Sequence, residues 1–137
     1  MMAHKILIVE DNPRWQRIYA RMVEELNQES LEVTFLAAST FAEAIAAIRK
    51  EAFDLAIVDL RLDERDEGNN GGQKILEHIF HSDKRFPVII ISGFGTAEIA
   101  RDALKKYQAL DFLLKESFDT SKLLSTIKEA FSSAKEL

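Results

Sequence analysis

The sequence has no cysteine, which excludes disulfide bonds, thiolate metal sites and cysteine nucleophiles. It has no apolar run near the roughly 18 residues that a membrane-spanning helix needs. The first residues, Met1 to Lys5, precede a strand-like segment and contain no apolar signal-peptide core. Positive charge is not in excess, because the net charge is -5, and this argues against binding to a nucleic-acid backbone. We therefore expect a cytoplasmic protein with neither a membrane nor a nucleic-acid partner.

The length and composition fit one domain. The chain has 137 residues, of which 47% are hydrophobic and 30% charged, as is usual for a globular domain with one core. There is no internal repeat and no low-complexity tail. We expect a single domain over residues 1–137 and no output domain.

Short apolar runs alternate with amphipathic segments. The expected strands lie near residues 6–9, 31–36, 55–58, 88–91 and 110–114. The first expected helix begins near Pro13. The others cover about residues 40–50, 73–81 and 96–107 and a last segment from about residue 119. Strands that are apolar throughout, alternating with helices, predict a parallel sheet with helices on both faces. In such sheets ligands bind at the carboxyl ends of the strands, near the point where strand order reverses.

Two local patterns refine this outline. Thr40 and Glu43 have the spacing of a capping box, with Ala42, Ile45 and Ala46 expected on the buried side of that helix. The segment from Arg61 to Gly72 is charged and glycine-rich, which predicts a loop that is long for an α/β connection.

The residues that end the predicted strands carry complementary chemistry. Glu10 and Asp11 follow the first strand, Asp59 ends the third, Ser92 the fourth and Lys115 the fifth. Converging carboxylates raise one another's pKa, and a hard divalent cation such as Mg²⁺ relieves that repulsion. A carboxylate can also attack phosphorus, with a lysine neutralising the phosphoryl charge and a hydroxyl donating to it.

Each of these residues also has a simpler interpretation. Asp59 could be a turn residue, and Glu10 with Asp11 could belong only to a capped helix start. Ser92 could mark a tight turn, and Lys115 could be a surface lysine. The coincidence of complementary groups at four separate strand ends favours a phosphoryl site, with Asp59 as its nucleophile.

This pattern resembles the receiver domains of bacterial response regulators, the phosphoacceptors of two-component signalling. The resemblance covers about residues 5–131 and rests on four ordered segments, Ile6–Asn12, Asp54–Leu60, Pro87–Gly93 and Asp111–Lys115. It implies a flavodoxin-like α/β fold, a doubly wound five-stranded parallel sheet of order 2-1-3-4-5 with five helices.

The resemblance also implies a metal site. Asp59 is implied as the phosphorylated aspartate and as a ligand of Mg²⁺. Asp11 is implied as a direct ligand and Glu10 as a ligand through water. The backbone carbonyl of Arg61 would complete the shell.

A switch is implied beside that site, with Ser92 as the switch hydroxyl, Phe112 as the switch aromatic and Lys115 as the phosphate-binding lysine. The implied donor is a phosphohistidine on a histidine kinase or histidine phosphotransfer protein. The output partner is an unknown protein, and the face of the fourth helix, fifth strand and fifth helix could form a homodimer. The domain would catalyse only its own phosphorylation and dephosphorylation.

Three departures from the family pattern stand out. Glu116 follows Lys115 where receivers usually have a proline, and Asp63 replaces a proline in the long loop. Phe112 replaces a tyrosine or histidine and has no hydroxyl, so we expect it to favour a buried position. Trp15 is open to two interpretations, a docking aromatic for the phosphodonor or a packing residue.

Two other functions compete with the phosphoacceptor. A receiver-fold adaptor that is not phosphorylated would usually have lost one of the site residues. An aspartyl-phosphate phosphatase would need an acid/base aspartate two positions after Asp59, where this chain has Arg61.

Overall fold

The computed structural model describes residues 3–60, 71–83, 85–93 and 97–135. The strands are β1 (Ala3–Val9), β2 (Glu32–Ala38), β3 (Leu55–Asp59), β4 (Val88–Ser92) and β5 (Asp111–Leu114). The helices are α1 (Pro13–Gln28), α2 (Phe41–Lys50), α3 (Gly71–Phe80), α4 (Ala97–Lys106) and α5 (Thr120–Lys135), with a 3-10 turn, η2 (Lys115–Ser117). The predicted alternation is confirmed. Within the described ranges, no helix is long and apolar enough to cross a membrane.

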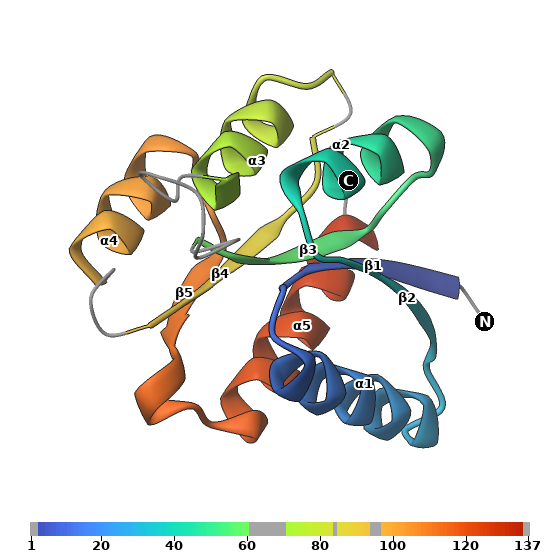
Figure 1. The fold of residues 1–137 in the computed structure, drawn as a ribbon. Helices are drawn as coiled ribbons and strands as arrows, with labels where there is room; N and C mark the ends of the chain where they lie inside the picture. The colour runs from blue at the N-terminus through green and yellow to red at the C-terminus, as the bar shows by residue number, and fades with distance from the viewer. Residues whose placement is uncertain (1–2, 61–70, 84, 94–96, 136–137) are drawn as a thin grey trace.

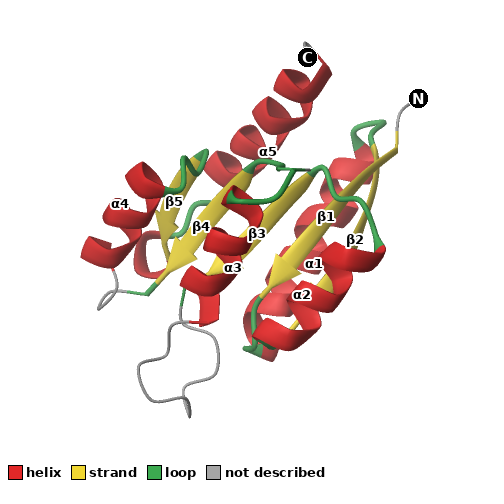
Figure 2. Cartoon of the chain, turned by 90° about the horizontal axis from the view of Figure 1, so that it is seen from above, coloured by secondary structure: helices red, strands yellow, loops and turns green. Residues whose placement is uncertain are grey.

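The strands form one parallel sheet of order β2-β1-β3-β4-β5, as predicted. Figure 2 shows the five strands side by side and pointing in the same direction. Val9 of β1 pairs with Val58 of β3, so the next residues, Glu10 and Asp59, reach the same edge of the sheet together. Strand order reverses between β1 and β3, which is where ligands bind in open α/β sheets.

Helices cover both faces of the sheet. Figure 1 shows α1 and α5 on one side and α2, α3 and α4 on the other. Successive strand side chains point to opposite faces, so Ile6 and Ile8 pack toward α1 and α5 while Leu7 and Val9 pack toward the other layer. The strands β3 and β4 are buried throughout, which explains their unbroken apolar sequences.

The start of α3 differs from the prediction. Gly71 and Gly72 belong to the helix and not to the preceding loop. A Cβ on Gly72 would lie 2.4 Å from the carbonyl oxygen of Asp59 and 2.5 Å from the Cα of Leu60. Only glycine allows the first turn of α3 to lie this close to the backbone that leaves β3. Residues 61–70 of the predicted loop lie outside the described residues.

The prediction for α2 was correct for its cap and partly wrong for its buried side. The Thr40 hydroxyl accepts a hydrogen bond from the Glu43 backbone N–H at 3.1 Å. Ile45 is buried as expected, but the alanines buried beside it are Ala44 and Ala47, whereas the predicted Ala42 and Ala46 are exposed. The apolar residues of α2 lie on several sides of the helix, so composition alone does not determine which side faces the sheet.

Candidate functional site

Three carboxylates meet at the carboxyl edge of the sheet. One carboxylate oxygen from each of Glu10, Asp11 and Asp59 lies within 4.8 Å of the other two. Glu10 is 1% exposed and Asp59 is 4% exposed, while Asp11 is half-buried. The predicted convergence of these side chains is therefore observed. Buried like charges at this spacing repel one another unless a cation lies among them.

The loop between β1 and α1 is held by hydrogen bonds around Glu10. Asn12 caps α1 by accepting from the Arg14 backbone N–H at 2.8 Å, and its own N–H donates to Glu10 Oε2 at 3.2 Å. The side-chain amide of Gln16 donates to the Glu10 carbonyl at 2.7 Å and to the Ser39 hydroxyl at 3.2 Å. Gln16 thus joins the ends of β1 and β2, a role that the sequence prediction missed.

Lys115 supplies the positive charge of the site. It opens η2 directly after β5, and its Nζ lies 2.9 Å from Asp59 Oδ2 and 2.9 Å from Glu10 Oε1. Burial by itself lowers the pKa of this ammonium, but hydrogen bonds and charge from Asp59 and then Glu10 outweigh burial and raise the pKa. Lys115 is therefore fully protonated at neutral pH and partly neutralises the acidic cluster.

The pKa of the Glu10 carboxyl is strongly raised. Burial, followed by the negative charge of Asp59, raises the pKa of Glu10 from 4.5 to about 7, although Lys115 acts in the opposite direction. Tyr19 is 1% exposed and lies near Glu10 and Asp59. Burial raises the pKa of its hydroxyl, and the charges of Glu10 and Asp59 raise it further. The proximity of Tyr19 to the carboxylates was not predicted from the sequence.

Ser92 and Phe112 lie on the next two strands, β4 and β5. Ser92 ends β4 and is 0% exposed, and its hydroxyl has no hydrogen-bond partner among the described residues. Phe112 of β5 is half-buried and packs against the core on the α2–α3–α4 side, and its expected preference for a buried position stays a prediction. Arg61, whose carbonyl was predicted to bind metal, lies outside the described residues, as does Asp63.

The cluster has the donor set of a site for a hard divalent cation. All three predicted side-chain ligands offer carboxylate oxygens, which Mg²⁺ and Ca²⁺ prefer. Among the described residues, the Lys115 ammonium alone does not balance three carboxylates, and the charge of Asp59 adds to burial in raising the pKa of Glu10. The residues present therefore fit a bound divalent cation.

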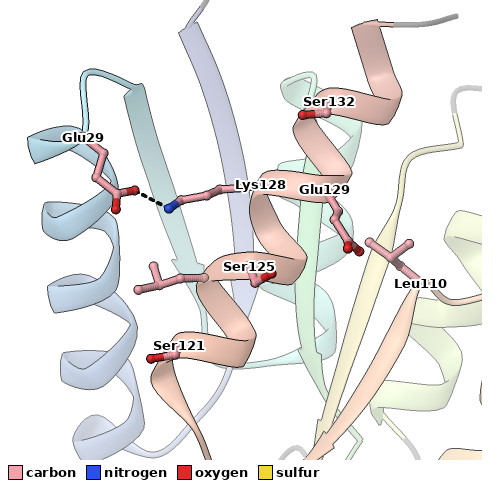
Figure 3. A pocket seen from close by; sticks show the side chains of 8 residues that line it. Glu29, Leu110, Ser121, Ser125, Lys128, Glu129 and Ser132 are labelled. Atoms are coloured by element: carbon pink, nitrogen blue, oxygen red, sulfur yellow. Dashed lines mark ion pairs between the residues drawn. The ribbon is translucent and has the colours of Figure 1, made fainter.

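A separate groove of about 640 Å³ runs along α5, away from the cluster. Figure 3 shows Lys128 reaching from α5 to Glu29 on the other side of the groove, an ion pair of 2.6 Å. None of the carboxylates described above lines it. The lining consists of Glu29, Leu110, Ser121, Leu124, Ser125, Lys128, Glu129 and Ser132.

Comparison with known proteins identifies the family. The response regulator receiver domain family matches residues 6–128, and this chain belongs to it. The two-component response regulator ORR26 of Oryza sativa subsp. japonica is 33% identical over 112 residues, which is 81% of this chain and 17% of the relative. The chain spans about a fifth of the length of the curated relatives that it matches.

Solved structures share the fold over almost the whole chain. The CheY-like receiver domain protein of Methanospirillum hungatei is 26% identical with a TM-score of 0.77, covering 99% of this chain and 100% of that one. The receiver domain of the sensor histidine kinase PA1611 of Pseudomonas aeruginosa is 20% identical with a TM-score of 0.73, covering 96% and 99%. That structure has a magnesium ion coordinated in its active site cleft.

Proposed function

We propose that this receiver domain accepts a phosphoryl group on the carboxylate of Asp59. The observation that carries the proposal is the position of Asp59 close to both carboxylates and an ammonium group. Its carboxylate lies within 4.8 Å of the two other carboxylates, and Oδ2 lies 2.9 Å from the Lys115 ammonium. A carboxylate can attack phosphorus when the charge of the incoming phosphoryl group is neutralised nearby.

The proposed metal ligands are the side chains of Glu10, Asp11 and Asp59, with the backbone carbonyl of Arg61 as a further ligand. Magnesium, when bound, would neutralise charge on the cluster and on a phosphoryl oxygen. Support comes from the all-oxygen donor set and from the shared fold with the PA1611 receiver domain, whose cleft holds magnesium.

The remaining residues have roles that follow from their places. Lys115 would transfer one of its contacts from the carboxylates to the phosphoryl group, acting as a point charge. The buried Ser92 hydroxyl, which has no partner among the described residues, would donate a hydrogen bond to a phosphoryl oxygen. Phe112 of β5 pairs with Ile90, two residues before Ser92 on β4, and would respond to a movement of Ser92, so that the two would form a local switch.

We further propose a phosphohistidine donor on a histidine kinase or histidine phosphotransfer protein. The domain would catalyse no reaction other than its own phosphorylation and dephosphorylation. Its output would be a protein contact on α4, β5 and α5, the face that could also form a homodimer. We propose that the chain acts in the cytoplasm as a receiver domain.

The test is incubation with acetyl phosphate and Mg²⁺, followed by intact-mass and peptide mass spectrometry. We expect one phosphoryl adduct on the wild type, none on Asp59→Asn, and an unchanged adduct on Asp102→Asn, which alters an exposed carboxylate of α4. An adduct that persists in Asp59→Asn would refute the acceptor assignment. A wild type that gains no mass with acetyl phosphate or beryllofluoride would instead favour a receiver-fold adaptor.

A further inference from the structure

Trp15 contacts the functional lysine and the segment that carries it. It is the only tryptophan in the chain and lies in the first turn of α1. The Lys115 Nζ lies over its ring, 5.1 Å from the centroid. The Phe118 ring meets it edge-on, with centroids 5.1 Å apart and planes at 87°. One side chain of α1 therefore touches both ends of the segment 115–118.

Among the described residues, few other contacts hold the segment 115–118. The turn η2 has no side-chain hydrogen bond at its cap, and Glu116 and Ser117 are exposed. Phe118 follows the turn, is half-buried and packs against the core on the α1–α5 side. Contact between Phe118 and Trp15 therefore ties the end of the turn to α1, and the ion pairs of Lys115 tie its start to the carboxylates.

The ring also completes the surroundings of the ammonium. The ammonium nitrogen of Lys115 lies 2.9 Å from a carboxylate oxygen of both Glu10 and Asp59 and donates a hydrogen bond to Asp59 Oδ2. The electron-rich face of Trp15 lies on another side, where it attracts a cation without accepting a full hydrogen bond. Lys115 remains only 19% exposed, so this attraction is weakly screened by water.

We propose that Trp15 is a positioning residue that holds the Lys115 ammonium where a phosphoryl group on Asp59 would meet it. The inference rests on the proposed phosphoacceptor function. It differs from a docking role at the kinase interface, because a ring that acts through Lys115 affects every phosphodonor alike. The tilted contact between the rings of Trp15 and Tyr19, with 6.0 Å between centroids, helps to keep the orientation of Trp15.

The first experiment needs no phosphorylation. In the metal-free protein, NMR should show the ε-methylene protons of Lys115 shifted upfield by the ring current of Trp15. We expect Trp15→Leu to abolish this shift and Trp15→Phe to retain part of it. Arg17→Ala, an exposed change on the same helix, should leave it intact. A Lys115 shift that is the same in Trp15→Leu as in the wild type would overturn the proposal.

The second experiment measures phosphorylation by acetyl phosphate and by a phosphohistidine donor, with Mg²⁺ affinity as the companion readout. We expect Trp15→Leu to slow both donors by about three- to tenfold, with Trp15→Phe intermediate, because one cation–π contact of moderate strength is lost. Mg²⁺ affinity should stay within about twofold, since the carboxylates are retained. Slowing confined to the phosphohistidine donor would overturn the proposal in favour of docking.

These outcomes separate the inference from the proposed function. If the wild type gains no phosphoryl group, the proposed function fails while the NMR shift still decides whether the ring holds the ammonium. If the wild type is phosphorylated and both Trp15 variants match it in rate, only the positioning role fails. Trp15→Phe keeps an aromatic ring against Phe118, so it decides the matter even if Trp15→Leu folds poorly.

Discussion

The Lys115 ammonium lies 2.9 Å from the Asp59 carboxylate although the two residues are 56 positions apart in the chain. Their strands are not neighbours, because β4 lies between β3 and β5. The lysine therefore reaches across the end of β4, where the buried Ser92 hydroxyl is located. Because this ammonium contacts the carboxylates of both Asp59 and Glu10, any bound metal or phosphoryl group must share them with it.

Glu10 gives the metal-free protein an unusual dependence on pH. Its pKa rises from 4.5 to about 7 in the folded state, so folding favours the protonated carboxyl. This contribution to stability is complete below about pH 4.5 and is lost as pH rises through about 7. With chelator present, we therefore compare melting temperatures at pH values from 4.5 to about 7. Over this range the wild type should lose stability relative to Glu10→Gln, by the equivalent of about 1–3 kcal/mol.

Metal binding should release the carboxyl proton of Glu10. Because a ligand must be deprotonated to bind metal, Mg²⁺ affinity should increase from pH 6 to pH 8, with proton release measurable by calorimetry in buffers of different ionisation enthalpy. In Glu10→Gln this proton release should disappear. Parallel stability curves for the wild type and Glu10→Gln would show that Glu10 does not titrate in this range.

Ser92→Ala should weaken the response to beryllofluoride without lowering the free energy of unfolding. The Ser92 hydroxyl is fully buried and has no partner among the described residues, an arrangement that costs about 1–3 kcal/mol. We expect the metal-free free energy of unfolding to stay the same or rise by up to about 2 kcal/mol in denaturant titrations. The spectral change on adding beryllofluoride and Mg²⁺ should weaken. Loss of stability in Ser92→Ala, with no loss in the exposed control Ser125→Ala, would contradict this account.

Gly72→Ala should disturb the backbone of the acceptor. Its methyl group would lie 2.4 Å from the Asp59 carbonyl oxygen, so α3 and the residues after β3 must separate. We expect destabilisation of about 1–3 kcal/mol in chemical unfolding and slower phosphorylation by acetyl phosphate. Gly93→Ala is the matched control, because a Cβ there meets nothing within 4 Å and should not change stability. Equal stability of the two variants would show that α3 is not packed as described.

Thr40→Ala should weaken the fold and leave the site intact. The hydroxyl caps α2 by accepting from the Glu43 N–H, and loss of such a cap costs about 1 kcal/mol. We expect a lower melting temperature and an unchanged rate of phosphorylation by acetyl phosphate. Thr40→Ser retains the hydroxyl and should recover most of the stability. A change in phosphorylation rate would show that α2 influences the site.

Much of the framework follows from local sequence. The unbroken apolar runs of β3 and β4 predict strands buried on both faces, and parallel strands bring their carboxyl ends to one edge. With β1 and β3 as neighbours, this predicts that Glu10, Asp11 and Asp59 converge. The strand order came from the family resemblance, because periodicity does not say which strands are neighbours.

Other features depend on contacts that no local pattern reports. The helix α2 is apolar on several sides, so its buried alanines were assigned partly to the wrong face. The helix α3 begins at Gly71, where the backbone of Gly72 comes close to that of Leu60. This contact is not visible in the local sequence, so the glycines were assigned to the loop. The contact between Trp15 and Lys115 joins residues from opposite ends of the chain.

The pairing of Val9 with Val58 has a consequence for the speed of metal binding. Two of the proposed ligands leave adjacent hydrogen-bonded strands, so folding itself has already met most of the entropy cost of bringing them together. The chain then needs little rearrangement when an ion arrives. Mg²⁺ loses its hydration water reluctantly, and we expect that exchange of water, and not motion of the protein, limits the rate at which this site is loaded.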